Sequence, residues 1–153
     1  MEVIEKIIKL LEDNKLNYEL KEHLPSYTSE QSAKYRNEPL KIGAKALILK
    51  ADKEFIMAVL SAEKKLDSKK LKLILQTKSL KFASTEDVKA ITSCIPGSIP
   101  PFGNLFNLKL FIDESFLENE YIAFNAGSLT KSIKMKLKDY LKITNHELNE
   151  FSQ

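Results

Sequence analysis

The chain has 153 residues, is 43% hydrophobic and carries a formal net charge of +3, so it is long enough for one domain, 1–153, with a substantial core. It has no apolar run of about 18 residues, which excludes a transmembrane helix, and its acidic, amphipathic start is unlike a secretory signal. One cysteine, Cys94, and two histidines argue against a disulfide or a Cys/His zinc site, and a cytoplasmic location is expected.

The first half of the chain alternates between helical and strand patterns. Apolar residues at helical spacing over 3–12 predict an amphipathic helix that ends near Asn14, and alternation over 17–22 predicts a short strand. Thr28 and Gln31 form a capping-box pattern, which predicts a helix from there to about Tyr35. The apolar runs 44–50 and 54–60 predict a hairpin of largely buried strands.

The second half continues the mixture of helices and strands. Asp67 predicts a helix cap with a helix through about Gln76, and Ser84 opens a helix that ends by Cys94. Strands are expected at 80–83, 108–112, 121–124 and 132–138, and a short terminal helix from Asp139 onward. Together the elements predict an α+β domain, with a central mixed, mostly antiparallel sheet and helices packed around it.

Residues 96–103, Pro-Gly-Ser-Ile-Pro-Pro-Phe-Gly, hold two of the four glycines and three of the five prolines of the chain. Proline fixes φ and lacks a backbone donor, whereas glycine adopts conformations that other residues avoid. This composition predicts a rigid loop that is shaped around Gly97 and whose free N–H groups could hold a carbonyl, a carboxylate or a phosphate. The alternative is a stiff turn between a helix and a strand.

Lys45 lies in an otherwise apolar strand, on the same face as Leu47 and Leu49. Those leucines are expected to point into the core, where a lysine is costly unless its ammonium reaches an anion or a cleft. The alternative is an edge position from which the ammonium extends to water.

Three further features are weaker candidates when each is taken alone. Asn125-Ala-Gly-Ser128 closes a strand with a small, polar turn, which could contact a ligand or be a plain turn. His23 could be a general base and Cys94 a nucleophile, but no neighbouring residue supports either role. The lysine clusters at 64–65, 69–70 and 131–138 are solvated surfaces unless they border a cleft.

Five segments, taken together in their order along the chain, match a known pattern: 22–23 (Glu-His), 27–30 (Tyr-Thr-Ser-Glu), 45–50 (Lys-Ala-Leu-Ile-Leu-Lys), 97–103 and 124–127 (Phe-Asn-Ala-Gly). They resemble the YbaK/ProX family of aminoacyl-tRNA deacylases, which is related to the editing domain inserted in bacterial prolyl-tRNA synthetase. The resemblance spans roughly residues 20 to 140. It implies a trans-editing enzyme that hydrolyses the ester between tRNA and a small mischarged amino acid of the alanine, serine, threonine or cysteine class. It also implies no covalent protein nucleophile and no cofactor.

The resemblance also implies roles for particular residues. Lys45 is the essential lysine, which contacts the terminal adenosine of the tRNA or orients the substrate. The backbone of Gly97, Ser98 and Ile99 holds the aminoacyl carbonyl or the attacking water, since the following prolines cannot donate. The implied substrate-binding residues are His23, Tyr27, Thr28, Pro100, Pro101, Phe102, Gly103, Asn125, Ala126, Gly127 and Ser128. Several relatives have histidine where this chain has Leu129, so amino-acid specificity stays open.

The expected partners are aminoacyl-tRNA and, as a further option, an aminoacyl-tRNA synthetase, with no membrane contact and a monomer or homodimer as the working form. The basic clusters would contact acceptor-stem phosphates. One alternative is a non-catalytic tRNA-binding or synthetase-associated module of the same fold, which binds tRNA without turnover. A weaker alternative is a small-molecule hydrolase or sensor that uses the loop on a free carboxylate and does not depend on tRNA.

Overall fold

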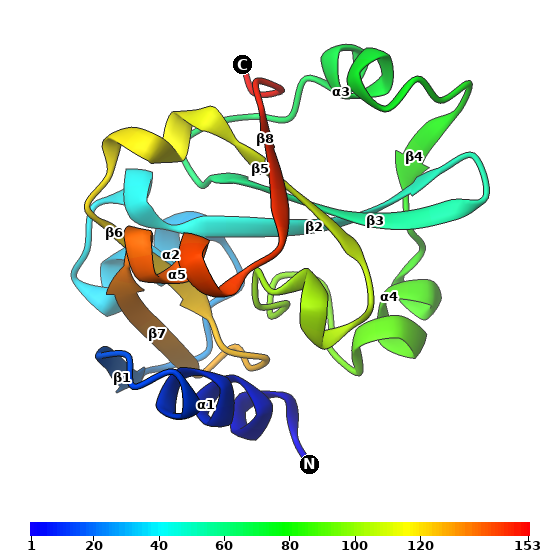
Figure 1. Ribbon diagram of the computed structural model, residues 1–153. Helices are drawn as coiled ribbons and strands as arrows, with labels where there is room; N and C mark the ends of the chain where they lie inside the picture. The colour runs from blue at the N-terminus through cyan, green and yellow to red at the C-terminus, as the bar shows by residue number, and fades with distance from the viewer.

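The computed structural model describes residues 1–153, which form five helices and eight strands (Figure 1). The helices are α1 (Val3–Asp13), α2 (Ser29–Arg36), α3 (Ser68–Leu75), α4 (Thr85–Thr92) and α5 (Leu137–Ile143). The strands are β1 (Tyr18–Glu22), β2 (Ala44–Ala51), β3 (Glu54–Ser61), β4 (Leu80–Phe82), β5 (Lys109–Asp113), β6 (Tyr121–Asn125), β7 (Lys131–Lys136) and β8 (His146–Asn149). Short 3-10 turns lie at 40–42, 103–105 and 114–118.

The strands are divided between two sheets. A five-stranded sheet has the order β4-β2-β3-β5-β8, antiparallel from β4 to β3 and parallel from β3 to β8. A three-stranded antiparallel sheet has the order β1-β7-β6, and a parallel bridge between Gly43 and Ala123 joins the two sheets. The predicted α+β fold with mixed, mostly antiparallel pairing is confirmed, although the sequence pattern indicated one central sheet rather than two.

Three helices begin at the caps that the sequence predicts. The side chains of Thr28, Asp67 and Ser84 accept hydrogen bonds from the backbone N–H groups three residues later. Gln31 Oε1 also reaches back, and it accepts from the Tyr27 N–H at 2.8 Å. These local bonds set the direction in which α2 leaves the loop before it, and that loop borders the site described below.

The C-terminal part differs from the sequence prediction. β7 ends at Lys136 and α5 begins at Leu137, two residues before Asp139, and β8 then pairs in parallel with β5. β8 lies at the sheet edge with both central residues exposed, so it carries no alternating apolar pattern that predicts a strand. The strand is held by its pairing with β5, and the segment after it by Asp113, which accepts from the Phe151 N–H at 2.8 Å and the Ser152 hydroxyl at 2.7 Å.

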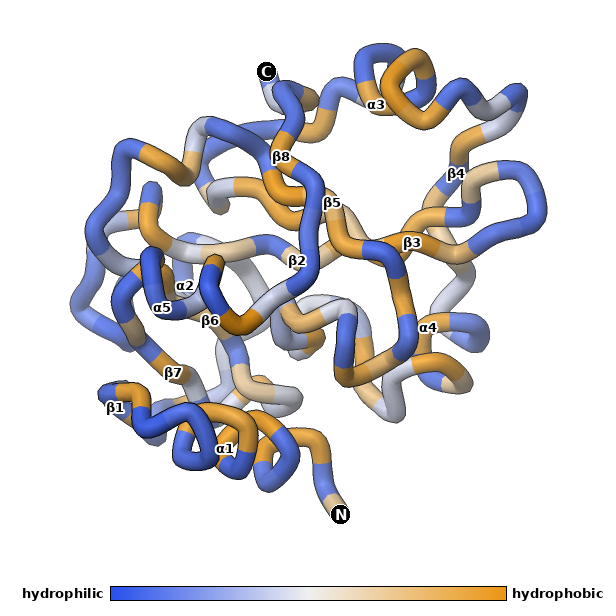
Figure 2. Tube along the Cα trace, viewed as in Figure 1, coloured by the Kyte–Doolittle hydropathy of each residue, from blue (hydrophilic) through white to orange (hydrophobic).

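Two apolar clusters hold the layers together. The larger one packs Met57 and Val59 of β3 against buried residues of both α1 and the three-stranded sheet, such as Ile7 and Ile133. The smaller one lies under α3, where Leu71 packs with alternate residues of the five-stranded sheet. Figure 2 shows the corresponding apolar stretches in the sheet strands and along one face of α1. None of the helices has the length and apolar character that a membrane span requires.

Candidate functional site

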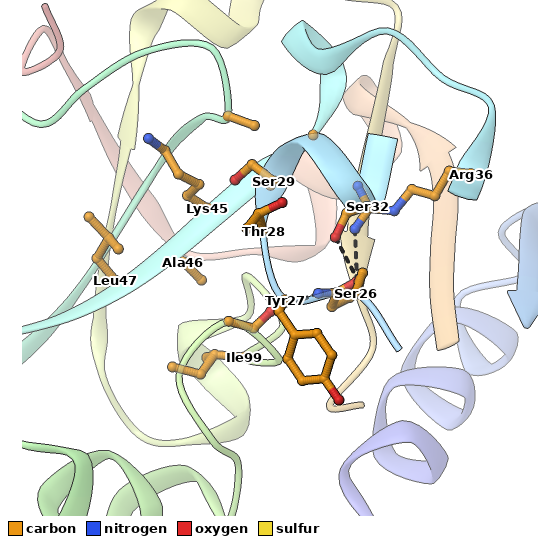
Figure 3. Close-up of a pocket in the computed structure, with 15 residues that line it drawn as sticks. Ser26, Tyr27, Thr28, Ser29, Ser32, Arg36, Lys45, Ala46, Leu47 and Ile99 are labelled. Carbon is orange, nitrogen blue, oxygen red and sulfur yellow. Dashed lines mark hydrogen bonds between the residues drawn. The ribbon is translucent and has the colours of Figure 1, made fainter. Parts of the chain in front are cut away.

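A pocket of about 190 Å³ lies where the N-terminal end of α2, the start of β2 and the loop 96–103 meet (Figure 3). Its lining comes from segments far apart in the sequence: Ser26, Tyr27, Thr28, Ser29, Ser32, Arg36, Gly43, Ala44, Lys45, Ala46, Leu47, Ala62, Gly97, Ile99 and Asn125. The pocket therefore brings together six of the residues that the sequence singles out: Tyr27, Thr28, Lys45, Gly97, Ile99 and Asn125.

Lys45 reaches the pocket from β2, where Figure 3 shows it beside Leu47. Its side chain is half-buried, and Nζ donates to the carbonyl oxygen of Lys64. Burial lowers the pKa of the Lys45 ammonium, an effect that Glu30 opposes and Lys65 reinforces. An ammonium carries three donors, so two remain for a ligand after the bond to Lys64.

The loop 96–103 has two unpaired backbone donors on residues that line the pocket. Gly97 has φ of +91°, and its carbonyl accepts from Asn125 Nδ2 at 2.7 Å. The N–H groups of Gly97 and Ile99, both pocket-lining residues, have no acceptor within the protein. The N–H of Ser98 donates to the Ile95 carbonyl at 3.1 Å, and the side chain of Ser98 is buried. Of the three donors that the sequence predicts, two are therefore free and Ser98 is engaged.

The second half of this loop belongs to the core rather than to the pocket lining. Phe102 is fully buried and meets the rings of Phe124 and Tyr140 edge to face, each at 5.3 Å between centroids. The Tyr140 hydroxyl donates to the Pro101 carbonyl, and a side chain at Gly103 would meet the Leu108 carbonyl at 2.6 Å. Pro100 accepts from the Phe102 N–H at 2.9 Å. The structure thus places none of the residues 100–103 in the pocket wall.

The end of β6 and the turn after it also contribute only part of their residues to the pocket wall. Asn125 lines the pocket, whereas Ala126 is buried in the larger apolar cluster. Gly127, with φ of +78°, donates its N–H to the Ser98 carbonyl at 2.9 Å, and Ser128 Oγ contacts Thr130 Oγ1 at 3.0 Å. Gly127 therefore supports the loop 96–103, and none of Ala126, Gly127 and Ser128 lines the pocket.

His23 is not one of the residues that line the pocket. Its Nδ1 is 2.8 Å from the Leu24 carbonyl and its Nε2 is 2.7 Å from Ser132 Oγ, while the ring stacks on Tyr35. Because a carbonyl only accepts, Nδ1 donates to Leu24, and Nε2 shares a hydrogen bond with the Ser132 hydroxyl. This arrangement gives His23 a structural place and leaves no nitrogen facing the pocket.

Two other predicted binding residues lie at the pocket mouth. Tyr27 is 74% exposed there, and Thr28 caps α2. Leu129 is not in the lining, and its carbonyl accepts from the Ser26 N–H at 2.9 Å. Cys94 is buried away from the pocket, and burial raises the pKa of its thiol, which removes it as a thiolate nucleophile. No group of three or more His, Cys, Asp or Glu side chains is placed to hold a metal ion.

Sequence reasoning missed the polar inner wall of the pocket. Arg36 is 6% exposed, and it donates from Nε to Ser132 Oγ and from Nη2 to Asn125 Oδ1, both at 2.9 Å. Burial lowers the pKa of the Arg36 guanidinium to about 10, and the negative charge of Glu38 opposes this shift. Ser26 and Ser32 are also buried, and the Ser32 hydroxyl donates to Ser26 Oγ at 2.8 Å (Figure 3). The sequence does contain one signal that sets Arg36 apart, because it is the only arginine among the 24 lysines and arginines.

Comparisons with known proteins match nearly the whole chain. A family model described as the aminoacyl-tRNA editing domain matches residues 23–143. The "Multifunctional Ser/Thr-tRNA deacylase ProXp-y" of Escherichia coli (strain K12) is 33% identical over 152 residues, which cover 96% of this chain and 91% of that protein. The "Prolyl-tRNA editing protein ProX" of Acetoanaerobium sticklandii is 26% identical over 99% of this chain and 96% of its own length.

The fold is similar to that of solved structures as well. A crystal structure of a protein put forward as a trans-editing enzyme for prolyl tRNA synthetase has a TM-score of 0.85 and 20% sequence identity. The matched region covers 100% of this chain and 98% of the chain in that crystal structure, so the similarity of fold extends over every element described above.

Proposed function

The chain belongs to the aminoacyl-tRNA editing domain family, and we propose that it is a trans-editing deacylase that hydrolyses the ester between tRNA and a small mischarged amino acid. One observation carries the proposal: a single pocket holds the half-buried Lys45 ammonium and the two unpaired N–H groups of Gly97 and Ile99. The names of the two curated relatives, a deacylase and an editing protein, favour an enzyme over a non-catalytic module.

The reaction is direct attack of water on the ester. The water oxygen adds to the aminoacyl carbonyl carbon and the bond to the ribose oxygen breaks. One water proton goes to the ribose oxygen, the other goes to solvent, and the amino acid leaves as a carboxylate. The N–H groups of Gly97 and Ile99 stabilise the negative charge that develops on the carbonyl oxygen, at about 3 kcal/mol for each well-placed donor. An ester is already activated, so orientation of ester and water supplies much of the remaining rate.

Lys45 anchors the tRNA end in this mechanism. Its free donors suit a phosphate or ribose oxygen of the terminal nucleotide, because an ammonium is a compact point charge. Tyr27, exposed at the mouth, offers a ring on which the terminal adenine can stack. Both residues thus act on the tRNA part of the substrate, and the loop donors act on the ester.

The pocket wall favours a small, hydroxyl-bearing amino acid. Gly43, Ala44 and Ala46 make part of the wall, and a pocket of about 190 Å³ excludes large side chains by volume. The buried hydroxyls of Ser26 and Ser32 offer hydrogen bonds that an alanyl group cannot use. We therefore expect Ser32→Ala to slow hydrolysis of seryl and threonyl esters about tenfold relative to the alanyl ester.

The tRNA body is expected to lie across the lysines next to Lys45. Lys65, Lys69 and Lys70 are exposed, and Lys65 is close enough to influence the pKa of Lys45. In the second cluster Lys134 is paired with Glu38 at 2.7 Å, which leaves it less available for phosphate. We propose that residues 1–153 act as one domain on cytoplasmic tRNA, alone or as a homodimer, with association to a synthetase as an option and no membrane contact.

The test is a panel of charged tRNAs. The protein is mixed with tRNAs that carry alanine, serine, threonine, cysteine or proline, and ester loss is followed over time. Selective hydrolysis of one or two small esters supports the proposal. Retained tRNA binding with no hydrolysis of any ester favours the non-catalytic module, and hydrolysis that is independent of tRNA favours the small-molecule alternative.

A further inference from the structure

Arg36 is a buried cation whose hydrogen-bond partners are all neutral. Its side chain donates to the hydroxyl of Ser132 and the amide oxygen of Asn125. The carboxylate that acts on it, Glu38, is hydrogen-bonded to Lys134 at 2.7 Å. Burying an arginine without a bonded carboxylate is costly for the fold alone, and an apolar residue would fill the space at lower cost. The position of Arg36 in the pocket wall therefore points to a role in the site.

Arg36 holds the amide oxygen of Asn125 both directly and through Ser132. Arg36 Nη2 donates to Asn125 Oδ1 at 2.9 Å, and the Ser132 hydroxyl donates to the same oxygen at 3.1 Å. Arg36 Nε in turn donates to Ser132 Oγ at 2.9 Å, so one guanidinium positions both donors to Asn125. With its oxygen held in this way, the amide of Asn125 must turn its NH₂ group toward the loop.

The NH₂ group of Asn125 in turn fixes one peptide unit of the loop. Asn125 Nδ2 donates to the Gly97 carbonyl at 2.7 Å, and the N–H at the other end of that peptide, from Ser98, donates to the Ile95 carbonyl. Both ends of the unit are thus held. The N–H groups of Gly97 and Ile99, which flank it, have no acceptor in the protein and are the donors available to a substrate.

We propose that Arg36 is a positioning residue for deacylation, which acts through Asn125 to fix the peptide unit that joins Gly97 to Ser98. This inference rests on the proposed function. The planar fork of arginine explains the residue type, since one guanidinium serves Ser132 and Asn125 at once and an ammonium holds no such fixed pair. Arg36 does not touch the ester in this account.

The kinetic test uses three variants and one matched control. Lys34, exposed on the same helix and of the same charge, provides the control Lys34→Met. Arg36→Met and Asn125→Ala are each expected to lower kcat about 100-fold with KM changed less than about threefold. The double variant is expected to lose no more than the worse single variant, because both changes release the same peptide. The inference would be overturned if the kcat losses of the two single variants multiply in the double variant. It would also be overturned if only KM changes, or if Arg36→Met keeps the wild-type kcat.

A second readout needs no substrate. Amide hydrogen exchange at Ser98 and Gly127 is expected to be at least tenfold faster in Arg36→Met and unchanged in Lys34→Met. Arg36→Lys, which keeps the charge, is used if Arg36→Met does not fold, and the same increase is expected. Unchanged exchange refutes the positioning role. If the wild-type protein hydrolyses no ester, the proposed function fails, and exchange still decides whether Arg36 holds the loop.

Discussion

Replacing Gly97 with alanine separates the stability of the loop from its activity. Gly97 has φ of +91°, a conformation that side chains disfavour, but a Cβ built there meets no atom within 4 Å. No clash adds to the stability cost, which is therefore at most the backbone strain, about 1–2 kcal/mol. For a domain of this size about 1 kcal/mol corresponds to roughly 2–4 °C, so Gly97→Ala is expected to lower Tm by about 2–8 °C.

The effect on activity is expected to be much larger. An alanine relieves the strain by rotating φ, which turns the Gly97 carbonyl away from Asn125 Nδ2 and displaces the neighbouring N–H donors. Loss of one such donor lowers the rate about 100- to 1000-fold. The assay compares single-turnover hydrolysis of the preferred aminoacyl-tRNA by wild type and Gly97→Ala, well below both melting temperatures.

Gly127→Ala is the matched comparison. Gly127 also has positive φ, at +78°, but its added Cβ would lie 2.9 Å from Val3 Cγ1, so overpacking adds about 1–3 kcal/mol to the same strain. Gly127→Ala is therefore expected to melt lower than Gly97→Ala. Wild-type activity in Gly97→Ala at a reduced Tm would refute the role given to the loop, and an unchanged Tm would refute the argument from strain.

Three further predictions concern the C-terminus, the tRNA surface and the pocket mouth. Burial acts to raise the pKa of Asp113, but hydrogen bonds from Ser115, Phe151 and Ser152 outweigh it and hold the pKa below its ordinary value. The resulting stability is present above the unfolded pKa and is lost as pH falls through the lower folded value, so the Tm deficit of Asp113→Asn should shrink between about pH 5 and pH 2. A deficit that is independent of pH would contradict this. Lys65→Ala should reduce the log–log salt slope of tRNA binding by about 1, whereas the remote Lys53→Ala should not, and equal slopes would remove Lys65 from the tRNA surface. Tyr27→Ala should raise KM about tenfold and leave kcat within about threefold, and a loss confined to kcat would argue against stacking.

Local signals in the sequence predicted much of the fold. The caps Thr28, Asp67 and Ser84 bond to N–H groups three residues away, so residue type and spacing alone locate the helix starts. β8 could not be predicted in this way, because it is held by its pairing with the distant strand β5, and the residues just after it by a contact with Asp113, 38 and 39 positions earlier. The split into two sheets likewise depends on which strands pair, and periodicity does not contain that information.

The pocket, like the fold, could be predicted only in part from the sequence. Lys45 and Gly97 were visible as residues out of keeping with their surroundings, and both line the pocket. Phe102 and Gly103 belong to the same unusual loop but pack into the core, because a motif does not tell which of its residues face a cavity. Arg36 was missed because its partners lie 89 and 96 positions away, so nothing near it in the sequence indicates what it binds.

The central claim is that this pocket is where the ester is hydrolysed, and Lys45 tests it most directly. Lys45→Ala is compared with Lys53→Ala, an exposed lysine at the β2–β3 turn, on whichever ester the wild type removes. The account predicts that hydrolysis falls at least 100-fold in Lys45→Ala, with an unchanged circular dichroism spectrum, and stays at the wild-type rate in Lys53→Ala. Full hydrolysis by a folded Lys45→Ala protein would contradict it.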